Sequence, residues 1–204
     1  MYKQRLMISA LSALMVLGVG CKKNAVDKEA FKSSLNNYLA SQMQCLWSAP
    51  VKLPAQADAS NDKQTMGFDA LTDAGLLTRK AVEKKRFLIG SKQANDYDLS
   101  DQGRQAWTAD ASQPGYGNFC YGHPQVTSID NYSPEAGNAT QYTVSYHYQV
   151  NSLPGWANSV EMKTAFRSLD AATAPQAGTA TLVKGDNGWL IQNAQPGATP
   201  GSAQ

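Results

Sequence analysis

The sequence contains few of the residues from which catalytic and metal sites are built. It has only two histidines and three cysteines among 204 residues. His123 lies in a Gly-His-Pro turn and His147 on the polar side of an alternating segment, and neither has a patterned carboxylate nearby. Metal ligation and Ser-His-Asp catalysis both need such a grouping. We therefore expect no enzyme activity, no metal and no cofactor, and two exposed or hydrogen-bonded histidines.

The N-terminal apolar stretch is short for a permanent membrane span. It runs from Leu6 to Gly20, which is 15 residues, whereas a transmembrane helix needs roughly 20. Lys3 and Arg5 precede it, and a positive segment followed by a short apolar one is typical of a secretory signal peptide. We predict that residues 1–20 direct export from the cytoplasm.

Residues 17–21, Leu-Gly-Val-Gly-Cys, resemble the lipobox of bacterial lipoproteins. In that family the cysteine is acylated, with chains such as palmitate, and becomes the mature N-terminus. The resemblance implies a lipid on Cys21 and a protein anchored in the cell envelope, facing the periplasm. Lys22 is not the aspartate that retains enteric lipoproteins at the inner membrane, so the outer membrane is expected. Gly18 and Gly20 also fit ordinary secretory cleavage, which leaves a soluble secreted protein as the alternative.

Cysteine arithmetic agrees with a lipid on Cys21, because an even pair then remains. Cys45 and Cys120 would lie in an oxidising compartment, where a disulfide persists. Both have large apolar or aromatic neighbours, which favour burial: Leu46 and Trp47, Phe119 and Tyr121. We predict a Cys45–Cys120 disulfide, with two separate buried thiols as the alternative.

Charge excludes a further class of partner. Removal of Lys3 and Arg5 from the 18 basic residues leaves 16, which equals the number of acidic residues. Nucleic-acid binding relies on the neutralisation of phosphates by an excess of basic groups. We therefore expect no nucleic-acid partner for the mature chain.

The N-terminal half reads as a helix followed by a small mixed unit. A stripe at helical spacing follows the capping candidates Asn24 and Asp27: Phe31, Leu35, Tyr38, Leu39, Met43 and Leu46. A helix at 65–77, strands at 87–89 and 97–99, and a helix at 101–107 capped by Ser100 come next. On residues 70–77 (ALTDAGLL) and 97–104 (YDLSDQGR) this unit resembles the winged-helix family. It lacks a recognition helix rich in Arg, Lys, Asn and Gln, so the resemblance implies a scaffold and no DNA function.

One dense basic run lies in this unit: Arg79, Lys80, Lys84, Lys85 and Arg86. As a charged strand edge or wing it would discourage unwanted strand pairing. The functional alternative is binding to anionic lipid head groups or to a cell-wall polymer. The sequence does not decide between a charged strand edge and a binding surface.

The C-terminal half alternates with period two, which is typical of strands. Tyr142 to Val150 forms the clearest strand, 160–167 the next, and 179–184 and 189–192 flank an Asn-Gly turn. With 125–130 added, we predict about five antiparallel strands with one apolar face, which the first helix covers.

These elements predict an α+β fold. An N-terminal helix and a small winged-helix-like unit would pack with a C-terminal antiparallel sheet of about five strands. The expected organisation is a signal peptide (1–20), a lipid tether (21–28), a helical, winged-helix-like region (29–112), a sheet region (117–193) and a disordered tail (194–204).

For function, we expect a non-enzymatic, lipid-anchored envelope protein that binds another protein or an envelope component. Trp156, at an expected hairpin tip, is the candidate contact with a partner or membrane, because exposed tryptophans mark such contacts. The alternative is a carrier of a small apolar ligand or lipid, held in a cavity between helix and sheet. A third hypothesis is a hydrolase whose active-site residues do not form a recognisable pattern.

Overall fold

The computed structural model describes residues 26–85 and 91–196. Cys21, Arg86, the strand expected at 87–89 and the end of the tail all lie outside these ranges. The helices are α1 (Lys28–Leu39), α2 (Asp62–Asp73), α3 (Asp101–Ala106), α4 (Val160–Ala165) and α5 (Arg167–Thr173), with a short 3-10 helix, η1 (Gly155–Asn158). Within the described ranges, no helix combines the length and the apolar character that a membrane span requires.

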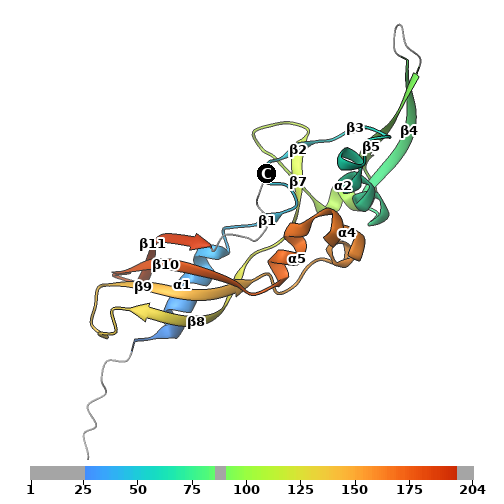
Figure 1. Ribbon diagram of the computed structural model, residues 1–204. Helices are drawn as coiled ribbons and strands as arrows, with labels where there is room; N and C mark the ends of the chain where they lie inside the picture. Colours follow the sequence, from blue (N-terminus) through green and yellow to red (C-terminus); the bar gives the residue numbers. More distant parts are fainter. Residues whose placement is uncertain (1–25, 86–90, 197–204) are drawn as a thin grey trace, which may run out of the picture.

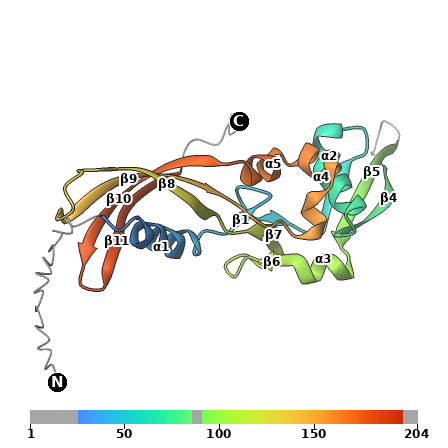
Figure 2. The ribbon, with the colours of Figure 1, turned by 90° about the horizontal axis from the view of Figure 1, so that it is seen from below.

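Three antiparallel sheets follow one another along an elongated molecule (Figures 1 and 2). The end sheet has the order β11-β10-β9-β8, formed by Gly188–Pro196, Gln176–Gly185, Gln141–Gln149 and Gln125–Ser133. In the central sheet β7 (Tyr116–Gly122) pairs with β1 (Gln44–Cys45), β2 (Val51–Lys52) and β6 (Trp107–Ala109). At the other end β5 (Ser91–Leu99) lies between β3 (Ala55–Asp58) and β4 (Leu77–Lys85).

Helix α1 covers the apolar face of the end sheet, as the sequence predicts. Asp27 begins the helix by accepting hydrogen bonds from the backbone N–H groups of Glu29 and Ala30, both at 3.1 Å. The ring of Phe31 is fully buried and lies 5.1 Å from those of Tyr142 and Trp189. Helix and sheet therefore form a core of their own.

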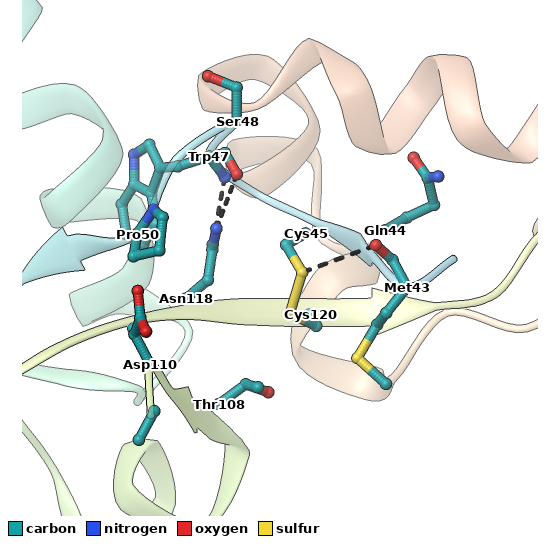
Figure 3. A pocket seen from close by; sticks show the side chains of 12 residues that line it. Met43, Gln44, Cys45, Trp47, Ser48, Pro50, Thr108, Asp110, Asn118 and Cys120 are labelled. Atoms are coloured by element: carbon teal, nitrogen blue, oxygen red, sulfur yellow. Dashed lines mark hydrogen bonds between the residues drawn. A yellow bond between two sulfur atoms is a disulfide. The ribbon is translucent and has the colours of Figure 1, made fainter. Parts of the chain in front are cut away.

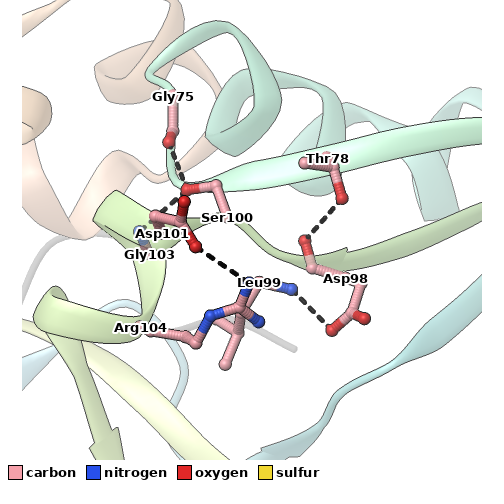
Figure 4. A network of polar contacts seen from close by, with 8 residues as sticks. All are labelled: Gly75, Thr78, Asp98, Leu99, Ser100, Asp101, Gly103 and Arg104. Atoms are coloured by element: carbon pink, nitrogen blue, oxygen red, sulfur yellow. Dashed lines mark hydrogen bonds and ion pairs between the residues drawn. The ribbon is translucent and has the colours of Figure 1, made fainter.

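A second core fills the centre and the far end of the molecule. It joins the central sheet to the helices α2, α4 and α5. At its edge Ser100 caps α3, accepting from the N–H of Gly103 at 2.8 Å and donating to the carbonyl of Gly75 at 2.6 Å (Figure 4). A Cβ on Gly103 would lie 1.9 Å from the carbonyl oxygen of Leu76. This contact of the YDLSDQGR motif with the connection between α2 and β4 therefore requires glycine.

The predicted fold class is wrong. Residues 29–112, expected to be largely helical, contain six of the eleven strands described, and sheets dominate the molecule. Strands β1, β2 and β6 have only two or three residues each, too few for an alternating pattern to show. The order helix, strand, strand, helix is present in α2, β4, β5 and α3, but β3 pairs with β5 as a third strand of the same sheet.

Two C-terminal predictions also need correction. Residues 160–165 form helix α4 instead of a strand, because Ser159 caps it, accepting from the N–H of Met162 at 3.1 Å. Met162 and Phe166 are buried four residues apart, whereas Val160 is 75% exposed, which fits a helix and not an alternating strand. The tail expected to be disordered from residue 194 is part of strand β11 up to Pro196.

Candidate functional site

The chain passes from the first core to the second through a short segment, residues 44–48. Its first two residues form β1, which pairs with β7 so that Gln44 lies opposite Gly122 and Cys45 opposite Cys120. The two cysteines are joined in a disulfide, which confirms the predicted bridge. Pairing and bridge together fix the place where the two cores meet, which we call the junction.

A buried amide fixes the next part of the segment. The side chain of Asn118 on β7 accepts a hydrogen bond from the N–H of Trp47 at 3.2 Å and donates one to the carbonyl of Trp47 at 2.7 Å (Figure 3). The indole packs against the ring of Phe166, with centroids 5.5 Å apart. Backbone and ring of Trp47 are therefore both held, so the junction has rigid walls.

One hollow of about 440 Å³ lies beside the disulfide on the side of β6. Figure 3 shows its walls, which include Met43, Thr108 and Asp110. The hydroxyl and the N–H of Ser112 both bond to the Asp110 carboxylate and hold the pKa of that group below its usual value. This hollow therefore carries a negative charge.

A second hollow, of about 540 Å³, lies between the two cores, and we call it the junction hollow. Its walls contain no charged residue: Leu39, Gln42, Gln44, Cys45, Leu46, Trp47, Ser48, Tyr121, Pro124, Tyr148, Val150, Ser168, Ala172 and Gln176. The first core contributes Leu39 and Tyr148, whereas Leu46 and Tyr121 belong to the second. It shares residues 44, 45, 47 and 48 with the first hollow.

The polar groups of the junction hollow are neutral. Burial raises the pKa of both Tyr121 and Tyr148, so each hydroxyl keeps its proton at neutral pH. Tyr148 donates to the Oε1 of Gln176 at 3.1 Å, and the Nε2 of Gln176 donates to the carbonyl of Ala171 at 2.8 Å. These two side chains are held in place by each other and by helix α5.

In the described part of the basic run, Arg79 lies on the opposite face of β4 from Lys80 and Lys84. Arg79 is bound to Asp69 of α2 at 2.8 Å, and the hydroxyl of Tyr97 donates to the same carboxylate oxygen at 2.8 Å. Lys80 and Lys84 are exposed on the opposite face of β4, since side chains alternate along a strand. The side chain of Lys85, like all of Arg86, lies outside the described residues. Arg79 thus fastens the sheet to α2.

Trp156 does not occupy a hairpin tip. It lies in the 3-10 helix η1, half-buried, with its ring centroid 6.0 Å from that of Phe119. It packs against the second core together with Trp47. Its contact with a partner or membrane stays a prediction.

The two histidines lie apart and in different settings. His147 on β9 bonds through Nδ1 to the Oδ2 of Asp130 at 2.6 Å. The Nδ1 of His123, in the turn before β8, is buried and has no partner among the described residues. No cluster of three or more His, Cys, Asp or Glu suited to a metal occurs in the part of the chain that the structure describes.

Comparison with protein-family models, curated proteins and solved structures finds no match. The sequence predicted the bridge but not the junction hollow, whose polar residues Gln42, Tyr121 and Gln176 lie far apart in the chain and share no local pattern.

Proposed function

We propose that this chain is a non-enzymatic, lipid-anchored cell-envelope protein that faces the periplasm and binds an envelope component at the junction. The observation that carries the proposal is the concave junction itself, where two separately packed cores meet. Boundaries between packed units are preferred places for binding sites. The disulfide and the hydrogen bonds of Asn118 hold the walls of the junction in a fixed shape.

The arrangement of the ends supports an anchored orientation. Helix α1 begins at the end-sheet side of the molecule, whereas the β4–β5 hairpin projects from the opposite end (Figure 2). Cys21 precedes Lys28 by seven residues, which span at most about 25 Å when fully extended. A lipid on Cys21 would keep the end sheet near the membrane surface and hold the junction further away, accessible to a component of the periplasm.

Packing under α1 supports a binding module over a lipid carrier. Carriage needs an apolar cavity that encloses its ligand. Phe31 and Leu35 are completely buried in this core, and only Leu39, at the end of the helix, reaches the junction hollow. Side chains therefore fill the space in which a carrier would hold an acyl chain.

Two measurements test the proposal. Cells expressing the full chain are grown with an alkyne-labelled fatty acid, and we expect label on the wild type and on Cys45→Ser/Cys120→Ser, but not on Cys21→Ser. In intact envelopes, a photo-crosslinking residue at Ser48, an exposed wall residue, should capture a defined envelope component. The matched control is the same residue at Asn187, which is exposed in the β10–β11 turn. Equal capture from both positions, or unlabelled wild type, would contradict the proposal.

A further inference from the structure

We infer that the junction hollow binds an uncharged, amide-bearing sugar, of the N-acetylated amino-sugar class found in cell-wall glycan. The inference deepens the proposed function and rests on it for the source of the sugar. The residues that line the hollow determine which class of ligand fits. Three classes are possible: charged ligands, purely apolar ligands, and neutral ligands with hydrogen-bonding groups.

A charged ligand does not fit the hollow. None of its wall residues is charged, and a charge moved from water to such a place without a counter-charge loses its solvation. Both tyrosine hydroxyls keep their protons because burial raises their pKa. The first hollow, which contains Asp110, differs from the junction hollow in this respect.

A purely apolar ligand, such as an acyl chain, does not fit either. The side chains of Gln42, Gln44 and Ser168 are half-buried in the walls. The backbone N–H of Gln42 donates to the carbonyl of Leu39 at 2.9 Å, but among the described residues no hydrogen bond engages the side-chain amides of Gln42 and Gln44. An acyl chain would cut these amides off from water and leave them unsatisfied, which weakens binding.

A neutral sugar meets both requirements. The ring of a sugar has an apolar C–H face and a rim of hydroxyl groups, and an N-acetyl group adds one amide donor and one acceptor. Trp47, which is partly exposed, offers aromatic surface beside the aliphatic wall residues, whereas the rings of Tyr121 and Tyr148 are almost completely buried. The amides of Gln42 and Gln44 each offer both a donor and an acceptor. A volume of about 540 Å³ lies within the range of small-molecule sites, roughly 300–1,000 Å³.

The test is calorimetric titration of the protein purified from cells that express the full chain. The probes are oligomers of N-acetylglucosamine, oligomers of glucosamine, which are cationic and lack the acetyl group, and decanol, an uncharged apolar chain. We expect saturable binding of the N-acetylated oligomers, at least about tenfold weaker binding of the cationic ones, and none of decanol. Gln42→Leu and Gln44→Leu should each weaken binding about tenfold, the effect of one lost hydrogen bond.

The matched control is Gln192→Leu, because Gln192 is exposed on β11 and remote from the hollow. It should bind like the wild type, and thermal unfolding shows whether each variant folds. The inference is overturned if no N-acetylated oligomer binds, if both wall variants bind normally, or if decanol binds instead. Titration of the purified protein does not depend on the lipid anchor. If the sugar does not bind but Cys21 is labelled, only the sugar ligand is rejected. If the sugar binds but Cys21 is not labelled, only the lipid anchor is rejected.

Discussion

The disulfide at the junction should supply a large part of the stability of the second core. Cys45 and Cys120 are 75 residues apart, and closing a loop of this length in the unfolded chain contributes roughly 4.5 kcal/mol on the chain-entropy model. The perturbation is Cys45→Ser/Cys120→Ser, which removes the bridge and leaves no single thiol from the pair. Since small domains are stabilised by only about 5–15 kcal/mol in total, the change should be easily measured.

The assay is urea unfolding of the full chain, followed by tryptophan fluorescence. With a slope of about 2 kcal/mol per molar, the midpoint should fall by about 2 M in the double variant. Wild-type protein under reducing conditions should give the same midpoint, and Cys21→Ser should not change it. A loss below about 1 kcal/mol would refute the reasoning, because the β1–β7 pairing and the Asn118 bonds would then hold the junction without the bridge.

Three further outcomes follow from the packing. Phe31→Ala should destabilise the end sheet by about 3–5 kcal/mol in urea unfolding, since the ring is fully buried against Tyr142; an unchanged midpoint would contradict a packed core under α1. Gly103→Ala should lower the thermal midpoint clearly more than Gly155→Ala, because only the first Cβ meets a backbone oxygen; equal midpoints would contradict this. Burial raises the pKa of Tyr146 from 10.0 to about 12, so the stability it adds is complete below pH 10 and is lost as pH rises towards 12. Tyr146→Phe should reduce that alkaline loss, and a loss of the same size in both proteins, measured by circular dichroism, would exclude Tyr146 as its source.

Local signals in the sequence were sufficient for part of the fold. The stripe that begins at Phe31 and the cap at Asp27 predict α1, because both lie within a few turns of one helix. The predicted stripe continued to Met43 and Leu46, whereas the helix ends at Leu39: Met43 is exposed and Leu46 belongs to the second core. The alternation from Tyr142 to Val150 predicts β9, and the Asn-Gly pair predicts the turn that joins β10 to β11. In each case the residues that specify the element are neighbours in the chain.

Other parts depend on contacts that no local pattern reports. Residues 160–166 alternate in polarity, yet Ser159 and the packing of Met162 and Phe166 make α4 a helix. The central sheet consists of short strands that only β7 brings together. In the sequence, Arg79 is one of several neighbouring basic residues. In the structure it forms an ion pair with Asp69, which lies on helix α2. Tertiary contacts decide each of these outcomes.

The position of the candidate site follows from the presence of two cores. Residues of both cores line the junction hollow, Leu39 and Tyr148 from the first and Leu46 and Tyr121 from the second. Where two such units meet, their convex surfaces leave a concave gap, and polar side chains in that gap need not be buried. Gln42 and Gln44 line the hollow; Gln42 lies two residues before Gln44, which begins the strand β1 that the disulfide joins to β7. The bridge therefore fixes the same stretch of chain that carries the amides of the junction hollow, so structural stability and ligand binding depend on one short segment.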